Sequence, residues 1–497
     1  MIQGTGSGVG KSILTAALCR WFRNRGWNVA PFKAQNMSLN SHVTVDGDEM
    51  GRAQAYQAQA CGIEPHVCMN PVLLKPTGDN LSQVVLMGKP LRNANAQDYF
   101  ANRDEHMQAV RQAFDYLQER HDLIIIEGAG SPAEINLRER DIVNMATARM
   151  ANAPVLLVGD IDRGGVFAWM KGTYDLLTPE EQARIAGFII NKFRGDLDLL
   201  KPGIEMFEAL VPKPVLGVVP FQRELFVDEE DAIPDAAQAA KTPGPSTVRV
   251  DILRLPRISN FTDFTPLFED PNVIARYVWH PSQIQNPDLI IIPGSKNTLG
   301  DRAFIREQGL DRALTACHSA GTVLLGICAG FQILGTKLRD PWKVESDLGE
   351  TDGLGFLNLQ TTLNREKQTR QVTASTAGTG FFEEGLPVAG YEIHMGETEW
   401  DDSCTALFQD NSAQPASRLG VSNREGTVFG TYLHGIFDGD VFREAFLNRL
   451  RRMRGLPAPQ EGFNFSGLRE KQFDTLASLI EEHLDTRYIL NLLEKSR

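Results

Sequence analysis

A cysteine between two glycines carries the strongest chemical signal in this chain of 497 residues. Cys328 lies in Gly326-Ile327-Cys328-Ala329-Gly330, after an apolar run and before a helix-like run. This strand–turn–helix arrangement exposes a nucleophile at the top of an α/β sheet. The helix N-terminus behind the sulfur favours the thiolate, which is the reactive form. We therefore predict that Cys328 is a catalytic nucleophile. The alternative is a buried structural cysteine.

The C-terminal half also offers a base, which a thiol nucleophile needs as its partner. His434 lies in Tyr432-Leu433-His434-Gly435-Ile436, just after the last apolar run of that half. We predict that His434 is paired with Cys328. The alternative is a histidine with no connection to this cysteine.

The N-terminal end indicates a second site, a phosphate-binding loop formed by Thr5, Gly6, Ser7, Gly8, Val9, Gly10, Lys11 and Ser12. In the strict pattern G-x-x-x-x-G-K-[ST], Thr5 takes the first glycine position, and Gly4 lies one residue early. Backbone N–H groups of such a loop bind phosphate oxygens at a helix N-terminus. We expect Lys11 to reach the β- and γ-phosphates of ATP and Ser12 to bind Mg²⁺. The alternative is a glycine-rich turn.

Acidic residues follow two of the buried apolar runs. Glu127 follows Leu123–Ile126, and the run Val155–Val158 is followed by Asp160, Asp162 and Arg163. Ligands bind at the carboxyl ends of parallel strands, and carboxylates hold Mg²⁺ directly or through water. We predict Glu127 and Asp160 as metal ligands. The second segment could also serve the substrate or be no more than a capped loop.

Positioning these residues requires parallel strands separated by helices. Residues 1–227 alternate short apolar runs with helical stretches, which predicts a doubly wound α/β domain. The predicted strands are 29–32, 123–126, 155–158, 187–190 and 215–219. The predicted helices are 11–25, 50–61, 96–119, 141–151 and 166–177.

The rest of the chain predicts a linker, a second α/β domain and a helical tail. Residues 228–247 are acidic and then rich in Ala, Pro and Gly, which is typical of a linker. Residues 248–440 form the second doubly wound domain, with strands at 248–253, 289–292, 322–327, 390–394 and 428–432. The tail, 441–497, has an apolar stripe at helical spacing. This stripe serves either packing or an oligomer contact.

Composition limits the possible partners and the compartment. The chain has 63 acidic against 50 basic residues, and its net charge of −13 argues against a nucleic-acid binder. No apolar stretch reaches the 18 residues that a membrane span needs. The six cysteines show no CxxC spacing and fit a reducing cytoplasm. The oligomeric state stays open.

The offset phosphate loop resembles that of dethiobiotin synthetase and its relatives, which phosphorylate a carboxylate or carbamate. Those relatives have a phosphate-contacting lysine after the next strand. The resemblance implies this role for Lys33, in Pro31-Phe32-Lys33-Ala34. The alternative is a surface lysine.

The cysteine segment resembles the class I glutamine amidotransferases, which release ammonia from glutamine through a thioester. The segment Ile292-Pro293-Gly294-Ser295 resembles their oxyanion loop. The resemblance implies N–H donors near Gly294 or Ser295 and at Ala329, with Gln332 in the glutamine site. Many members carry Glu two positions after the histidine, where this chain has Ile436. Either a Cys–His dyad or an orienting group from elsewhere is therefore expected.

The combination of the two halves resembles the cobalamin-pathway amidotransferases. Segments 31–40, 159–167 and 390–396 resemble the cobyric acid synthases among them. This implies amidation of carboxylates b, d, e and g of a corrinoid, adenosylcobyrinic acid a,c-diamide. Each amidation would use one glutamine and one ATP, with an enclosed route for ammonia. The rivals are a cobyrinic acid a,c-diamide synthase and a phosphate-loop switch ATPase with a non-catalytic amidotransferase-like domain.

The same resemblance implies which residues contact the corrinoid carboxylates. The candidates are Gln35, Asn36, Asp162, Arg163 and, more weakly, Glu392 and His394, for which strand-end packing is an equal explanation. Asp141 opens a predicted helix, so it either caps the helix N-terminus or faces the substrate.

Overall fold

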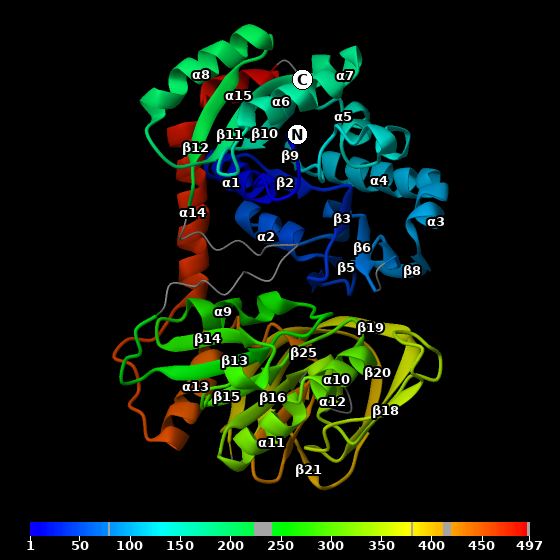
Figure 1. The fold of residues 1–497 in the computed structure, drawn as a ribbon, viewed down its shortest axis with the longest axis vertical. Coiled ribbons are helices and arrows are strands. Elements are labelled where there is room, and N and C mark those ends of the chain that lie inside the picture. The colour runs from blue at the N-terminus through cyan, green and yellow to red at the C-terminus, as the bar shows by residue number, and fades with distance from the viewer. Residues whose placement is uncertain (78–79, 223–240, 379–380, 411–418, 495–497) are drawn as a thin grey trace.

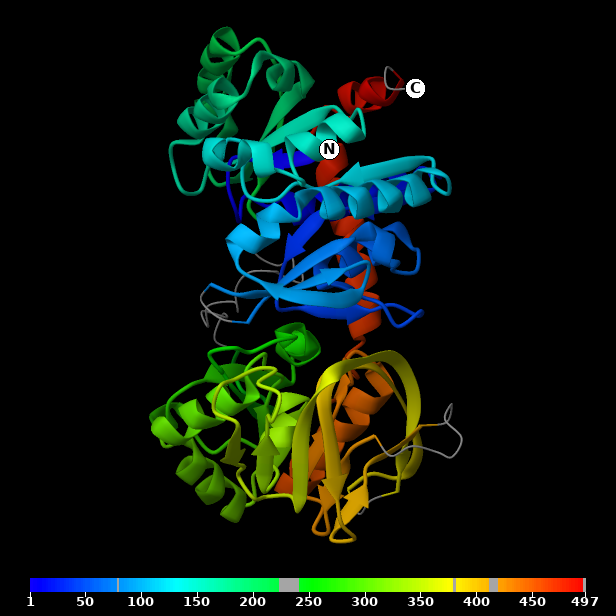
Figure 2. The ribbon, with the colours of Figure 1, turned by 90° about the vertical axis from the view of Figure 1, so that its right-hand side faces the viewer.

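The computed structural model describes residues 1–77, 80–222, 241–378, 381–410 and 419–494. Two α/β halves lie one above the other along the longest axis of the molecule, as Figures 1 and 2 show. Most of the predicted linker, residues 228–240, lies outside the described residues. Residues 241–247 have no helix or strand.

The N-terminal half contains the predicted doubly wound parallel sheet. Strand β9 pairs with β2, and a bridge between Ile2 and Glu127 joins this pair to β1. The order of the strands is β2 (Val29–Phe32), β9 (Leu123–Ile126), β1 (Ile2–Gly4), β10 (Val155–Asp160), β11 (Ile185–Phe193) and β12 (Val215–Pro220). Alternate residues of β10 enter two different cores: Leu156 packs with α1 (Lys11–Asn24), and Leu157 packs with α6 (Val166–Leu176). Helices therefore cover both faces of the sheet.

Two of the predicted helices are wrong in detail. The predicted helix 96–119 is split into α3 (Ala96–Ala101) and α4 (Arg103–Gln118), because Asn102 leaves the helical conformation between them. The predicted helix 141–151 is shortened to α5 (Met145–Met150). Helices α7 (Pro179–Arg184) and α8 (Leu197–Leu210) complete this half.

A small mixed layer lies between the parallel sheet and the C-terminal half (Figures 1 and 2). It contains β3 (Gln35–Met37), β6 (Val72–Pro76), β7 (Ser82–Leu86) and β8 (Lys89–Ala94), the pair β4 (Ser41–Val43) and β5 (Glu49–Gly51), and α2 (Arg52–Cys61). The backbone N–H of Ser41 donates to Asn260 Oδ1 at 2.9 Å, and the Tyr391 hydroxyl donates to Ser41 O at 2.9 Å. Strand β4 therefore binds directly to the other half.

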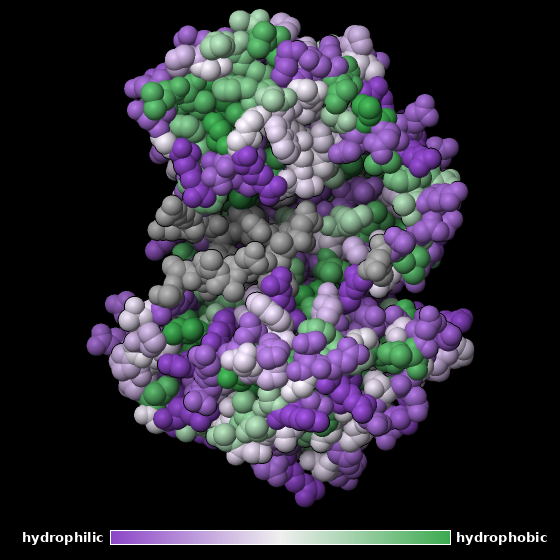
Figure 3. Space-filling view, in the orientation of Figure 1, coloured by the Kyte–Doolittle hydropathy of each residue, from purple (hydrophilic) through white to green (hydrophobic). Residues whose placement is uncertain are grey.

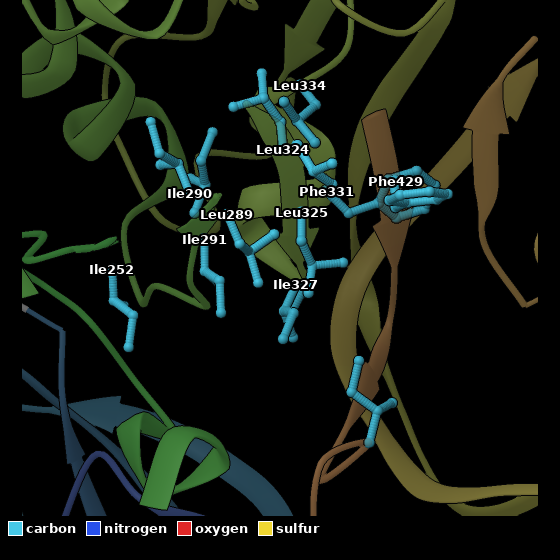
Figure 4. Packing of buried hydrophobic residues seen from close by; sticks show 14 of the residues in the cluster. Ile252, Leu289, Ile290, Ile291, Leu324, Leu325, Ile327, Phe331, Leu334 and Phe429 are labelled. Atoms are coloured by element: carbon cyan, nitrogen blue, oxygen red, sulfur yellow. The ribbon is translucent and has the colours of Figure 1, made fainter. Parts of the chain in front are cut away.

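The C-terminal half is built on a sheet with a parallel centre. Its order is β14 (Val273–Val278), β13 (Val248–Leu253), β15 (Leu289–Ile292), β16 (Val323–Ile327), β24 (Val428–Thr431), β23 (Val421–Asn423) and β21 (Cys404–Ala406). The last two strands run antiparallel to their neighbours. Ile290, Leu324 and Phe429 are fully buried in this core (Figure 4). The helices of this half are α9 (Thr265–Glu269), α10 (Thr298–Glu307), α11 (Leu310–Ser319) and α12 (Ala329–Ile333).

A second sheet in this half corrects the prediction for residues 390–394. They belong to β20 (Glu384–Trp400), which pairs antiparallel with β19 (Leu359–Ala377), and not to the parallel sheet. The other strands of this sheet are β17 (Lys337–Arg339), β18 (Glu350–Asp352), β22 (Phe408–Asp410) and β25 (Leu433–His434). Strand β19 alternates buried and exposed residues, so it has no apolar run that would have marked it as a strand.

The tail returns to the N-terminal half. Helix α13 (Asp440–Arg454) packs into the C-terminal core, whereas α14 (Phe465–His483) and α15 (Thr486–Glu494) lie against the upper half, in red in Figure 1. Phe473 and Ile480 are fully buried beside α1, and Arg20 Nε of α1 binds Asp474 Oδ1 at 2.8 Å. Within one chain, the apolar stripe therefore serves packing.

Two surface observations complete the fold. Among the described helices, none is long and apolar enough to cross a membrane. Figure 3 shows apolar side chains gathered over α8, where Leu199 is 82% exposed and Met206 and Leu210 are also exposed.

Candidate active site

Cys328 lies on a sharp turn between β16 and α12. Its φ of 53° is unusual for a residue other than glycine. Its backbone N–H donates to Thr431 O at 2.8 Å, and its carbonyl accepts from the N–H of Gln332, which fixes the turn. A Cβ on Gly330 would lie 1.8 Å from Ile292 O, so only glycine allows α12 to approach β15 this closely. The Gly-x-Cys-x-Gly spacing thus reflects steric need.

His434 is oriented by an aspartate from a distant segment. Its Nδ1 lies 2.6 Å from Asp263 Oδ2, and the Gly435 N–H donates to Asp263 Oδ1 at 3.1 Å. Burial alone would lower the pKa of His434, but Asp263 and the hydrogen bond and charge of Cys328 together raise it to about 10. The imidazole is therefore protonated at neutral pH, and the charged ring interacts directly with Cys328.

Asp263 is a functional residue that the sequence prediction missed. It lies 171 residues before His434, in the 3-10 helix Phe261–Phe264. Asp263 takes the orienting role that Ile436 leaves open. The sequence allowed either a Cys–His dyad or an orienting group from elsewhere, and the structure has the orienting group. The one signal in the sequence was an acid inside the apolar segment Phe261-Thr262-Asp263-Phe264.

The predicted oxyanion loop lies against this pair. A Cβ on Gly294 would lie 3.2 Å from His434 Cε1, so the loop backbone approaches the imidazole closely. Ser295 Oγ donates to Asp301 Oδ2 at 2.6 Å and holds the loop at the start of α10. Ser295, Ala329 and Gln332 line one pocket with Cys328 and His434. The backbone N–H groups predicted as oxyanion donors therefore belong to segments that border the nucleophile.

The second sheet covers the nucleophile from the other side. Cys328 Sγ lies 3.7 Å from Ile393 O of β20. The ring of His394 stacks on Tyr432 with centroids 3.7 Å apart, and the two rings are tilted by 12°. His394 lines the Cys328 pocket, whereas the other predicted corrinoid contacts except Glu392 lie in the N-terminal half. Glu392 on β20 is held by Arg370, whose Nε donates to it at 2.5 Å.

The phosphate loop in the N-terminal half connects β1 to α1. Lys11 Nζ donates to Gly6 O at 2.8 Å and Gly130 O at 3.2 Å, so its ammonium lies over the loop. Two groups missed by the sequence prediction brace the loop from β11: Asn191 Nδ2 donates to Val9 O at 2.8 Å, and Lys192 Nζ donates to Gly8 O at 2.5 Å. Both residues follow an apolar run. The expectation that ligands bind at the carboxyl ends of parallel strands could therefore have identified them.

Glu127 is the buried centre of the phosphate site. Its Oε1 accepts from Ser12 Oγ at 2.8 Å and Lys33 Nζ at 2.9 Å. Gln57 Nε2, which was not predicted, donates to Oε2 at 2.5 Å. Burial alone would raise the pKa of Glu127, but the charge of Lys33 and these hydrogen bonds lower it below its usual range. The carboxylate is therefore ionised and could bind a cation.

The predicted metal ligands are only partly brought together. Ser12 and Glu127 fit a Mg²⁺ site, since this ion takes one or two protein oxygens and completes its shell with phosphate and water. Asp160 Oδ2 instead binds Lys192 Nζ at 3.1 Å. No group of three or more His, Cys, Asp or Glu that could hold a metal ion occurs in the described parts of the chain.

Comparison with known proteins identifies both halves. Residues 1–234 match the CobQ/CobB/MinD/ParA nucleotide binding domain, and residues 249–442 match the CobB/CobQ-like glutamine amidotransferase domain. Cobyric acid synthase of Caldanaerobacter subterraneus subsp. tengcongensis is 46% identical, with 100% of this chain and 99% of that protein covered. Cobyric acid synthase of Photorhabdus laumondii subsp. laumondii is 49% identical, with 100% and 98% covered. The chain belongs to the cobyric acid synthase family.

Membership in the cobyric acid synthase family confirms the predicted class of enzyme, a glutamine-dependent ligase. A third relative, cobyric acid synthase of Sorangium cellulosum, is 48% identical, with 98% of this chain and 96% of that protein covered. The resemblance predicted from three short segments thus extends over the whole chain.

The residues predicted to contact the corrinoid have partners within the protein. The Tyr99 hydroxyl donates to Gln35 Oε1 at 2.6 Å, and Asn36 Nδ2 donates to Gln54 Oε1 at 3.0 Å. Asp162 pairs with Arg194 at 3.0 Å, and the side chain of Arg163 is largely exposed. Their contact with substrate stays a prediction.

Asp141 is the candidate for which the structure offers a full account. Its carboxylate accepts the N–H groups of Val143, Asn144 and Ala146 at 2.8–2.9 Å. These three bonds match the capping alternative, with the cap placed ahead of α5.

Proposed function

We propose that the protein amidates carboxylates b, d, e and g of adenosylcobyrinic acid a,c-diamide to give adenosylcobyric acid. Glutamine is the nitrogen source, and ATP with Mg²⁺ activates each carboxylate. The observation that carries the proposal is the similarity over the full chain to cobyric acid synthases. The two sites provide the groups that this chemistry requires.

In the glutamine site, the Cys328 thiolate attacks the side-chain amide carbon of glutamine. Backbone N–H groups near Gly294 or Ser295 and at Ala329 stabilise the oxyanion. The His434 imidazolium, held by Asp263, gives its proton to the departing nitrogen, which leaves as ammonia. A thioester remains on Cys328, and water hydrolyses it to glutamate.

In the phosphate site, the corrinoid carboxylate attacks the γ-phosphorus of ATP, the bond to the β,γ-bridging oxygen breaks, ADP leaves and an acyl phosphate forms. Lys11 and Lys33 stabilise the charge on the transferring group, and loop N–H groups hold the phosphates. Mg²⁺, held through Ser12 and Glu127, would neutralise phosphate charge. Ammonia then displaces phosphate, and the amide forms.

Buried polar residues connect the two halves, and we expect ammonia to cross this junction without contact with bulk water. From the C-terminal side, Ser41 Oγ donates to Glu49 Oε1 at 2.8 Å on β5. At the end of β5, the Gly51 N–H donates to Asn70 Oδ1 at 3.0 Å, and Asn70 Nδ2 donates to Lys33 O at 3.1 Å. Lys33 in turn pairs with Glu127 in the phosphate site. Ammonia that escaped to water would be protonated and lost as a nucleophile.

Mass spectrometry tests the proposal directly. Purified protein is incubated with adenosylcobyrinic acid a,c-diamide, Mg-ATP and glutamine labelled with ¹⁵N in the amide. We expect successive gains of labelled amide up to four. No gain with this corrinoid, but two gains with cobyrinic acid, would instead assign the a,c-diamide synthase activity.

Two variants separate the sites. Cys328→Ala should abolish glutamine-dependent amidation and keep amidation with ammonium, whereas Lys11→Ala should abolish both. Loss of the ammonium reaction in Cys328→Ala would contradict the division of labour. If the unmodified protein dimerises on binding ATP but does not hydrolyse glutamine, the result would favour a switch ATPase.

A further inference from the structure

His42 is a buried histidine at the junction of the two halves. It belongs to β4, in the small layer between the parallel sheet and the C-terminal half (Figure 1), and it is 9% exposed. Its ring centroid lies 5.7 Å from that of Tyr391, whose ring stacks beside His434 of the glutamine site. No step of the proposed mechanism uses this side chain.

The neighbour of His42 Nδ1 determines where the ring carries its hydrogen. Arg52 Nη1 lies 3.4 Å from Nδ1, and a guanidinium can only donate. Nδ1 is therefore the acceptor, and the hydrogen is on Nε2. This Nε2–H is buried and has no hydrogen-bond partner among the residues that the structure describes. A buried donor without a partner is costly, so a ligand that accepts a hydrogen bond is expected there.

On one side, His42 adjoins the glutamine site. Val43, the next residue of β4, forms a buried cluster with Tyr391 and Ile393 of β20. The carbonyl oxygen of Ile393 lies 3.7 Å from Cys328 Sγ. The same stretch of β20 therefore contacts both the nucleophile and the strand that carries His42.

On the other side, His42 adjoins the helix that reaches the phosphate site. Arg52, which holds Nδ1, is the first residue of α2. Gln57 of the same helix donates to Glu127 Oε2 in the phosphate site at 2.5 Å. His42 thus lies between elements of both sites, where a small molecule crossing the junction away from bulk water would pass.

The chemistry around the ring selects a neutral acceptor. Ammonia and water each offer a lone pair to an N–H donor, whereas ammonium, like a lysine ammonium, has only donors. The charge of Arg52 beside the ring also repels a cation. Burial and the charges of Arg52 and Arg469 lower the pKa of His42 to about 3, so the neutral ring can bind ammonia without giving it a proton. Bound ammonia stays a nucleophile.

We infer that the Nε2–H of His42 binds neutral ammonia as it crosses from the glutamine site to the phosphate site. His42 is then a positioning residue, which selects and holds the nucleophile before it meets the acyl phosphate. This inference rests on the proposed function, in which ammonia passes between the two sites.

The test removes the donor and keeps an aromatic ring. For His42→Phe, the number of glutamines hydrolysed per amide formed should rise about three- to tenfold, in line with the loss of one hydrogen bond. Glutamine hydrolysis itself should change little. His42→Gln offers an amide N–H in place of the imidazole N–H and should restore part of the coupling. Glutamate and amide are quantified in one reaction of the full-length protein.

His106→Phe is the matched control. His106 on α4 is 1% exposed, and its ring nitrogens also have no hydrogen-bond partner within the described parts of the chain. Its ring stacks on Tyr99 with centroids 4.4 Å apart, within the N-terminal half. This variant should keep the ratio of the unmodified protein. An equal rise in His106→Phe would overturn the inference, because the effect would then not depend on the position at the junction.

NMR separates ammonia from water at this nitrogen. In protein labelled with ¹⁵N-histidine, the Nε2–H signal of His42 is identified by its loss in His42→Phe. At alkaline pH, where ammonium chloride supplies neutral ammonia, this signal should shift with ammonium chloride and not with sodium chloride. A signal that does not respond to ammonium chloride would mean that the donor binds water only.

Two further results would overturn the inference. One is an unchanged ratio of glutamine to amide in His42→Phe. The other is an equal rise in His42→Phe and His42→Gln, which would assign His42 to packing at the junction. Failure of the proposed function looks different, because the unmodified protein would then form no corrinoid amide with either glutamine or ammonium.

Discussion

At Asp263, one carboxylate both orients the His434 ring and fixes the backbone that follows it. Oδ2 lies 2.6 Å from the imidazole Nδ1, and Oδ1 accepts a hydrogen bond from the N–H of Gly435. This arrangement fixes the orientation of the ring and stabilises the proton on Nδ1. The chemistry of Cys328 therefore depends on a residue of the 3-10 helix Phe261–Phe264.

Replacing Asp263 with Asn should preserve the fold and remove the negative charge. We expect glutamine hydrolysis to fall roughly 10²- to 10⁴-fold, because the imidazolium loses its partner. Amidation supported by ammonium should change little. Steady-state assays with each nitrogen source measure both effects, and an equal fall with ammonium would indicate a structural defect instead.

The charge of His434 also predicts a pH dependence. Its pKa of about 10 in the folded protein lies above the ordinary 6.5. The paired imidazolium therefore contributes its full stabilisation below pH 6.5, and this is lost as the pH rises through about 10. NMR of histidine-labelled protein should show the ring protonated at pH 8. In Asp263→Asn the pKa should fall, since burial then acts with less opposition. A pKa near 6.5 in the unmodified protein would contradict the ion pair.

Among the elements, α14 packs against a part of the molecule that lies far from it in the sequence. It comes from the C-terminal end, yet it covers α1, the helix that begins with Lys11 and Ser12. Phe473 packs against Tyr56 with ring centroids 4.8 Å apart. The tail therefore supports the phosphate site from behind.

Phe473→Ala should destabilise the N-terminal half by about 3–5 kcal/mol, because it leaves a cavity under α14. Thermal unfolding should occur at a lower temperature, and ATP should bind more weakly because α1 loses support. Thr475→Ala, at an exposed position of the same helix, is the control. Similar unfolding temperatures for the two variants would mean that α14 does not stabilise this half.

The elements also show why strand prediction succeeded in some places and failed in others. The runs 29–32, 123–126 and 289–292 match β2, β9 and β15 because these strands lie inside parallel sheets and are apolar throughout. The run 248–253 matches β13, although it contains Arg249 and Asp251. Strands β19 and β20 have one solvated face and polar sequences. They pair with each other as neighbours in the chain, so their polar sequences, and not a distant partner, concealed them.

For the whole molecule, the contact between the halves joins the glutamine site to the layer beside the phosphate site. The Tyr391 ring stacks beside His434 with centroids 5.4 Å apart, and its hydroxyl donates to Ser41 O across the junction. One side chain thus touches the glutamine site and the layer in front of the phosphate site. We expect this contact to keep ammonia release enclosed.

Tyr391→Phe keeps the ring and removes the bond across the junction. The number of glutamines hydrolysed per amide formed should rise about two- to tenfold, in line with the loss of one hydrogen bond. Tyr488→Phe is the matched control, because its hydroxyl also donates to a backbone carbonyl, Ala186 O at 2.9 Å, but away from the junction. Glutamate and amide are quantified in one reaction. An unchanged ratio in Tyr391→Phe would show that this bond does not seal the junction.

The sequence by itself determined the local chemistry of this protein. The turn at Cys328, the loop before Lys11 and the acid after β9 are set by steric and hydrogen-bonding needs that act over a few residues, so short segments reveal them. Only the tertiary structure decided that Asp263 orients His434, that α14 supports α1 and that Lys75 borders the glutamine pocket. These pairings bring together residues far apart in the chain, and their positions follow from sheet order and packing between the halves. No local spacing in the sequence records that information.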